Sequence, residues 1–194
     1  MLFRLLPVVI LVASLLVSGC AAIAVGGLAT GAAVVHDRRT TGTMIEDQNI
    51  EIKAASALAR DPDLKSRAHL NVTSYNLVVL LSGEAPSEEL KLRAGRIVRG
   101  IERVKRVHNE IVVAAPSSMM TRSSDTMITA RVKTALLGIK GLDDFDATRV
   151  KVVTENGTVF LMGIVTRAEA EAATEAARTV SGVQRVVRLF EYID

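Results

Sequence analysis

The chain has 194 residues, of which 49% are hydrophobic and 23% are charged, and its formal net charge is +3. This composition is too apolar for a disordered chain and too charged for a protein made mainly of membrane-spanning helices. The small charge excess is not typical of a nucleic-acid-binding domain. A single cysteine excludes an internal disulfide and any zinc site that needs two cysteines. We therefore expect folded material, as one ordinary domain or two small ones.

Residues 1–19 have the pattern of an export signal. The apolar run from Leu5 to Val17 fits a signal-peptide core and is shorter than the roughly 20 residues that span a bilayer. Ser18-Gly19-Cys20 resembles the lipobox of bacterial lipoproteins, whose cysteine is fatty-acylated, for example with palmitate, and becomes the first residue of the mature protein. We predict a signal peptide over 1–19 and lipidation at Cys20.

A flexible Ala- and Gly-rich tether is predicted over residues 20–43. An uncleaved membrane helix is the alternative, because residues 21–35 are also apolar and would lengthen the first apolar run. A buried structural role for Cys20 is a further alternative. Ala21 after the cysteine, in place of Asp, resembles the Gram-negative signal for sorting to the outer membrane, so we expect a lipid anchor there, facing the periplasm.

The rest of the chain is one unit repeated with a period near 80 residues. Three pairs of blocks carry the match: 47–50 with 125–128 at an offset of 78, 72–76 with 152–156 at 80, and 100–104 with 182–186 at 82. The extra residues of the second copy fall between the matched blocks, which places them in a loop and at a helix start. The repeat predicts two similar domains.

Each repeat contains, in chain order, a helix, a two-stranded hairpin, a second helix and a closing strand. Asp47 and Asp125 are the expected N-caps of the first helices, because apolar residues recur behind each at helical spacing. Asn156-Gly157 is a strong hairpin signal, and Gly100 and Gly182 stand where the second helices should end. The expected ranges are helices at 87–98, 126–139 and 166–180, hairpin strands at 70–74, 78–85, 150–154 and 158–165, and closing strands at 103–113 and 185–193.

The predicted fold class is α+β, with each domain ordered αββαβ as a three-stranded mixed sheet that carries helices on one face. We place the first domain at 44–114, a linker at 115–124 and the second domain at 125–194. A linker this short brings the two domains into contact.

The segment Thr154–Gly163, the Val-x-Leu-x-Gly strand and the Gly-containing entry to the closing strand resemble BON domains, the module of osmotically inducible periplasmic proteins. Two such domains behind a lipobox resemble the dual-BON outer-membrane lipoproteins, which maintain envelope integrity and gather at division sites. The resemblance covers nearly all of the chain after Cys20, including the Gly42-Thr43 lead-in. It implies binding of anionic phospholipid through the first helix of the second domain, and no enzymatic activity.

The first helix of the second domain is the candidate membrane surface. Met127, Arg131, Thr134 and Leu137 share its outward face, which mixes apolar side chains with a cation. The full set of predicted lipid-binding residues is Met120, Arg122, Met127, Arg131, Lys133, Thr134 and Leu137. The alternative is that Met127 and Leu137 pack against the other domain.

A second basic cluster consists of Arg93, Arg96, Arg99, Arg103 and Arg106. A solvated helix face is its ordinary explanation. The functional alternative is a surface for a partner, either an outer-membrane assembly or cell-wall remodelling protein or the carboxylates of peptidoglycan. Nucleic acid is not an expected partner, because stacking aromatics are absent from the cluster.

No catalytic, cofactor or metal site is predicted. His36, His69 and His108 share no metal-ligand spacing, and the acidic loop at 143–146 lacks the Gly and Glu of a calcium loop. Tyr75-Asn76 is expected to serve turn and edge packing rather than a domain contact or ligand site.

Overall fold

Helix α3 (Thr41–Arg60) opens the first domain of the computed structural model, which describes residues 37–142 and 145–194. Thr40 caps the helix by accepting a hydrogen bond from the Thr43 backbone N–H. The helix therefore begins more than a turn before Asp47, and the predicted N-cap role of Asp47 is wrong. Its side chain lies on the buried stripe of α3, which comprises Asp47, Ile50, Ala54 and Leu58.

Helix α6 (Met119–Leu137) opens the second domain in the same way. Ser118 caps it, so residues 119–124, which were expected in the linker, form its first turns. Asp125 is not the N-cap either and lies inside the helix. The buried stripe comprises Asp125, Ile128, Val132 and Leu136, each 78 residues after its counterpart in α3.

Each domain contains a mixed sheet whose central strand is the second of the hairpin. In the first domain β2 (Val78–Ala85) lies antiparallel to β1 (His69–Tyr75) and parallel to β3 (Arg106–Asn109). In the second domain β6 (Thr158–Val165) lies antiparallel to β5 (Lys151–Glu155) and parallel to β7 (Arg185–Tyr192). The predicted three-stranded mixed sheet is confirmed in the second domain, and in the first domain the closing strand is divided into β3 and β4 (Val112–Val113), so that the sheet has four strands.

Helices α5 (Glu88–Arg99) and α7 (Arg167–Arg178) connect the hairpins to the closing strands. Two short helices were not predicted: α4 (Pro62–Arg67), and the 3-10 turn η3 (Ala147–Arg149). The first closing strand is also interrupted, because Ile111 turns into the core between β3 and β4 (Val112–Val113).

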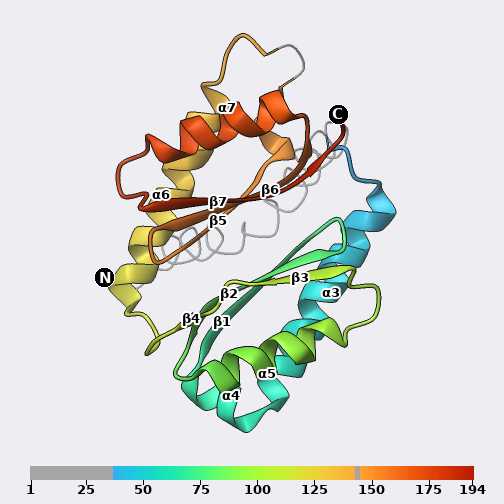
Figure 1. The fold of residues 1–194 in the computed structure, drawn as a ribbon, viewed down its shortest axis with the longest axis vertical. Coiled ribbons are helices and arrows are strands. Elements are labelled where there is room, and N and C mark those ends of the chain that lie inside the picture. The colour runs from blue at the N-terminus through green and yellow to red at the C-terminus, as the bar shows by residue number, and fades with distance from the viewer. Residues whose placement is uncertain (1–36, 143–144) are drawn as a thin grey trace, which may run out of the picture. The chain divides into compact units, whose positions relative to one another are not determined.

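The helices of each domain cover one face of its sheet, and the two sheets face each other (Figure 1). The faces meet through an apolar layer drawn from both domains. Its fully buried members are Tyr75, Leu80, Phe160 and Met162. Removing this apolar surface from water favours the contact between the domains.

The contact between the domains is reciprocal at its two ends. Asn76 Nδ2 of the first hairpin donates to the Glu191 carboxylate at 2.9 Å. Asn156 Nδ2, which is the equivalent atom of the second hairpin, donates to the Glu84 carboxylate. The Tyr75 hydroxyl also donates to the Arg149 carbonyl of the second domain at 3.3 Å. Tyr75-Asn76 therefore makes a domain contact, contrary to the expectation from sequence.

Candidate functional site

Asp125 fastens helix α6 to the sheet of its own domain. The Asp125 carboxylate accepts hydrogen bonds from the backbone N–H groups of Asn156 and Gly157, both at 2.9 Å. These two residues form the β5–β6 turn with φ values of 49° and 69°. The turn thus fixes one side of α6 against the sheet, and the opposite side is left facing solvent.

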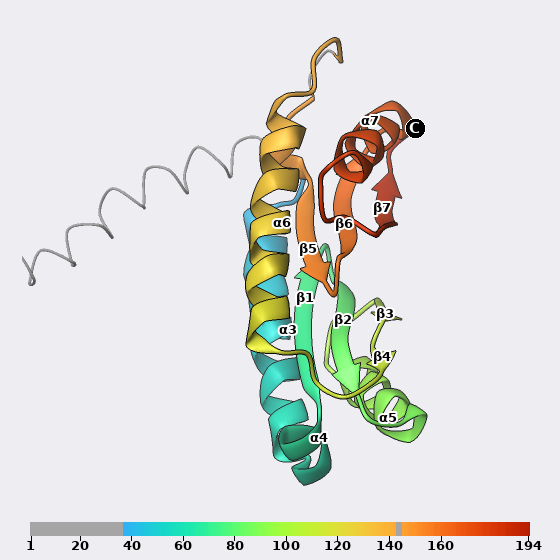
Figure 2. The ribbon, with the colours of Figure 1, turned by 90° about the vertical axis from the view of Figure 1, so that its left-hand side faces the viewer.

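Helix α6 lies along one side of its domain, beside β5 (Figure 2). Most of the predicted lipid-binding residues are exposed on this helix. Met120, Met127 and Leu137 are 83%, 54% and 73% exposed. Exposed Arg131, Lys133 and Thr134 lie on the same helix. The structure therefore presents these six side chains to solvent, and the alternative in which Met127 and Leu137 pack against the other domain is wrong.

Arg122 is placed differently from the other predicted lipid-binding residues. It is half-buried, and its guanidinium donates to the Ser117 carbonyl at 2.9 Å and contacts Met119 Sδ at 3.9 Å. Its side chain also lines a hollow that contains Asp125 and Glu155. Arg122 therefore braces the start of α6 and does not belong to the exposed face.

The end of α6 borders a second feature that sequence reasoning missed, a hollow of about 360 Å³. Lys133 and Leu137 form one wall, with Val150 and Val152 among the apolar residues that line the rest. Three cations surround the hollow: Arg39, Lys133 and Lys151. Arg39 pairs with Asp47 at 2.9 Å and Lys151 with Glu51 at 3.7 Å. Apolar walls with cations suit an amphiphile that has an anionic head.

The corresponding face of α3 carries different residues. At the offset of 78 residues, Asn49 and Ala59 occupy the places of Met127 and Leu137. Lys53, which corresponds to Arg131, lies 3.7 Å from the Glu102 carboxylate. The two domains therefore share a helix framework, but the cation of α3 at these positions is paired, and its exposed large apolar residues, Ile45 and Ile52, lie at other positions.

The basic cluster of the first domain is divided by its contacts. Arg93 pairs with Glu89 at 2.6 Å and with Asp63 at 3.2 Å, and these hydrogen bonds raise the pKa of Arg93. Arg103 pairs with Glu46 at 3.3 Å. The remaining arginines, Arg96, Arg99 and Arg106, are exposed and have no ion-pair partner among the described residues.

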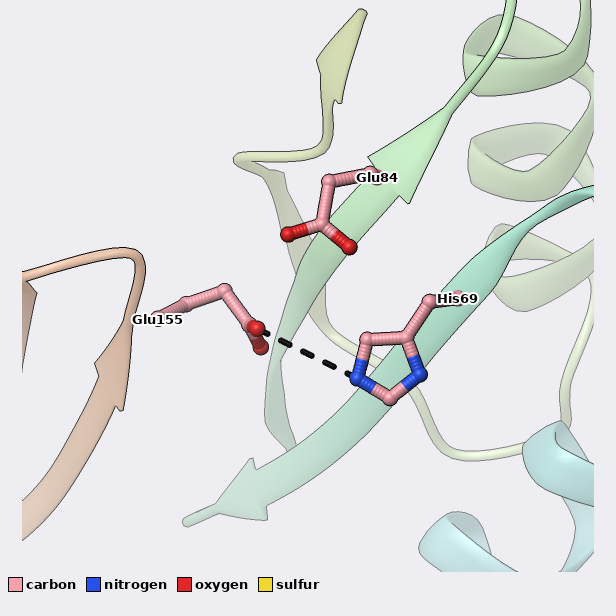
Figure 3. A group of neighbouring side chains, drawn as sticks. All are labelled: His69, Glu84 and Glu155. Atoms are coloured by element: carbon pink, nitrogen blue, oxygen red, sulfur yellow. Dashed lines mark ion pairs between the residues drawn. The ribbon is translucent and has the colours of Figure 1, made fainter. Parts of the chain in front are cut away.

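A cluster that no sequence motif indicated lies between the domains. One ligand atom each of His69, Glu84 and Glu155 lies within 4.8 Å of the others, and the side chains converge from β1, β2 and the end of β5 (Figure 3). Burial raises the pKa of Glu155; a hydrogen bond from Asn71 opposes this rise and the nearby Glu84 adds to it.

The BON domain family matches residues 46–115 and 124–194. The chain belongs to the BON-domain family. Outer membrane lipoprotein DolP of Haemophilus influenzae is 39% identical over 186 residues, covering 96% of this chain and 95% of that protein. The 21 kDa hemolysin of Actinobacillus pleuropneumoniae is 39% identical over 157 residues, covering 81% and 79%. Osmotically-inducible protein Y of Escherichia coli is 31% identical over 160 residues, covering 80% and 77%.

BON domain 2 carries the lipid-binding candidates, and BON domain 1 carries the basic cluster. The predicted signal peptide, Cys20 and the tether up to residue 36 lie outside the described residues. No helix within the described residues is both long and apolar enough to cross a bilayer.

Proposed function

We propose that this chain is a non-catalytic outer-membrane lipoprotein, anchored through Cys20, that binds anionic phospholipid with the exposed face of α6 in BON domain 2. The observation that carries the proposal is the combination of exposed Met127, Leu137 and Arg131 on one helix, where Arg131 has no ion-pair partner among the described residues, whereas Lys53 of α3 lies beside Glu102. The lipobox and the likeness to an outer membrane lipoprotein support the anchor.

The contact with lipid is weak by itself. A basic side chain near an anionic surface contributes about 1 kcal/mol, and salt screens it. Arg131 and Lys133 therefore attract the headgroups, and the exposed apolar side chains enter the interface. The hollow beside Leu137 receives part of a lipid headgroup region, with its phosphate near Lys133. The acyl anchor raises the local concentration of the domain at the membrane and supplies most of the residence time.

Flotation of residues 37–194 with vesicles tests the lipid contact apart from the anchor. We expect salt-sensitive binding to anionic vesicles and none to zwitterionic vesicles. The variant with Arg131→Glu and Leu137→Glu should lose binding. The matched control carries Lys53→Glu and Ala59→Glu at the equivalent positions of α3, and it should bind like the wild type. Equal binding by the α6 variant and the wild type would refute the assignment of this face.

The anchor has a separate test. Replacing Cys20→Ser should abolish palmitate labelling and release the chain from the outer-membrane fraction. A Cys20→Ser chain that stays in that fraction would contradict the anchor.

We also propose, from the family resemblance, a role in envelope integrity at division sites. Loss of the chain should then sensitise cells to large antibiotics, and a fluorescent fusion should gather at the septum; a uniform distribution would contradict the division-site role.

A second candidate function is an adaptor that regulates an outer-membrane assembly or cell-wall remodelling complex by protein contact. The observation in its favour is that Arg96, Arg99 and Arg106 are exposed and have no ion-pair partner in the described chain. Crosslinking in cells should capture a stoichiometric protein that is lost from the Arg96→Glu, Arg99→Glu variant. The Arg93→Glu variant is a poor probe, because it also breaks the contacts to Glu89 and Asp63.

A further inference from the structure

We propose that His69, Glu84 and Glu155 bind one divalent transition-metal ion of the zinc class across the interface of the two BON domains. The three side chains come from two strands of domain 1 and from the end of a strand in domain 2. The site exists only when both domains are docked. It is separate from the lipid-binding face of α6 and does not depend on the proposed function.

The geometry suits a small cation. Ligand atoms that lie within 4.8 Å of one another surround a point no more than about 2.8 Å from each of them. Zinc bonds to imidazole nitrogen and carboxylate oxygen are roughly 2.0–2.2 Å long, so small side-chain rotations close the site. An imidazole beside two carboxylates favours zinc-class ions over magnesium or calcium, which prefer all-oxygen sites.

The charge at the cluster also calls for a cation. Glu84 and Glu155 are 1% and 7% exposed. The Glu84 carboxylate accepts from Asn156 Nδ2 and from the Ser117 backbone N–H, and Glu155 accepts from Asn71 Nδ2 at 2.7 Å. All of these donors are neutral, and neutral donors leave the two negative charges uncompensated.

No lysine or arginine in the described chain forms an ion pair with either carboxylate, and the His69 Nε2 atom lies 4.0 Å from Glu155 Oε1. Two other charged groups line the hollow beside Glu155: the Arg122 guanidinium, which is turned to Ser117 and Met119, and the Asp125 carboxylate, which adds negative charge.

The opposite end of the same interface shows what this end lacks. At the offset of 80 residues, Arg149, Ile164 and Tyr75 occupy the places of His69, Glu84 and Glu155. The buried carboxylate at that end, Glu169, pairs with Arg38 at 2.6 Å and with Arg149 at 3.5 Å. One end of the interface thus has protein cations for its buried carboxylate. The other has two buried carboxylates and an imidazole, the ligand set of a metal ion.

The proposal is tested by titrating Zn²⁺ into the full chain in detergent against a chelating indicator. We expect one tightly held ion per chain. His69→Gln and Glu155→Gln should each weaken binding at least about tenfold, whereas the control His108→Gln should bind like the wild type. Equal zinc affinity in all four proteins, or no bound ion in the wild type, would overturn the proposal. So would binding of Mg²⁺ or Ca²⁺ in preference to Zn²⁺.

A second pair of measurements keeps the test sharp if a variant folds poorly. Zinc should raise the thermal unfolding midpoint of the wild type. It should not raise the midpoint of the Glu84→Gln variant, which lacks one ligand and has one buried negative charge fewer to compensate. X-ray absorption at the zinc edge of the wild type should show one imidazole and oxygen ligands. A sulfur ligand would place the ion at Cys20 or a methionine and would refute the site.

Discussion

At the scale of single residues, the buried aspartate of each first helix decides how the helix is attached. Asp125 accepts two backbone hydrogen bonds from the β5–β6 turn, and Asp47 accepts from the backbone N–H groups of Asn76 and Leu77, both at 2.8 Å. A carboxylate group suits this role, because its two oxygens can accept several hydrogen bonds at once. Each aspartate therefore fastens the helix to the hairpin that follows it.

We expect Asp125→Ala to lower the free energy of unfolding by about 3 kcal/mol, because it leaves two turn N–H groups without an acceptor. Asp125→Asn keeps one acceptor oxygen and should cost about half as much. Urea denaturation measures both. Ser124→Ala, at the neighbouring exposed position of α6, is the control and should leave the midpoint unchanged. If Asp125→Ala behaves like this control, the fastening role is wrong.

At the scale of elements, the close approach of β1 and β2 depends on one glycine. Gly83 has a φ of +111°, and a Cβ atom there would lie 2.0 Å from the His69 carbonyl oxygen. The clash is with backbone, which a side-chain rotation cannot relieve. We expect Gly83→Ala to destabilise the fold by about 3 kcal/mol, from strain and clash together.

A substitution at Gly141 distinguishes the cost of the backbone conformation from the cost of the steric clash. Its φ is +81°, but a Cβ atom there would meet nothing within 4 Å. Gly141→Ala should therefore cost only about 1 kcal/mol, from the backbone conformation alone. Thermal unfolding of the two variants checks the difference, and equal midpoints would show that the contact with His69 is unimportant.

At the scale of the whole described unit, the chain before α3 ties BON domain 1 to BON domain 2. Arg38 donates to the Ile164 carbonyl at 2.9 Å and pairs with Glu169. Burial would raise the pKa of Glu169, but hydrogen bonds from Arg38 and the Thr166 backbone outweigh it, so the pKa is lowered from its ordinary 4.5. The unfolded chain thus takes up this proton at a higher pH than the folded chain. The stabilisation is complete above pH 4.5 and is lost as the pH falls through the folded pKa.

Arg38→Gln should therefore lower the free energy of unfolding at neutral pH by roughly 2 kcal/mol. The gap between variant and wild type should narrow as the pH falls below 4.5, because Glu169 becomes protonated. Urea denaturation over a series of pH values measures this. Arg67→Gln, at an exposed position of α4, is the control. A gap that stays constant in acid would mean that Arg38 acts through Ile164 alone.

The sequence by itself determined the two repeats and the order αββαβ, and it indicated an outward face of α6 without excluding that this face packs against the other domain. These features are encoded locally, by apolar spacing, turn residues such as Asn156-Gly157, and Gly100 at the end of α5. The second predicted helix end, Gly182, lies beyond the end of α7, whose C-cap is Thr179. The sequence pattern placed the starts of α3 and α6 too late in the chain. An aspartate before an apolar stripe is compatible both with an N-cap and with a buried side chain that binds the hairpin turn. The spacing of Asp47 from Ile50 and Ala54, which puts all three on one face, was the signal available.

Only the tertiary structure decided the interface and what gathers there. His69 and Glu84 are brought together by the β1–β2 pairing, and Glu155 joins them only when the second sheet docks on the first. The hollow beside Leu137 likewise needs Arg39 and Lys151, which lie far apart in the chain. Local sequence patterns cannot encode such long-range contacts, because these contacts depend on how two complete sheets pack against each other.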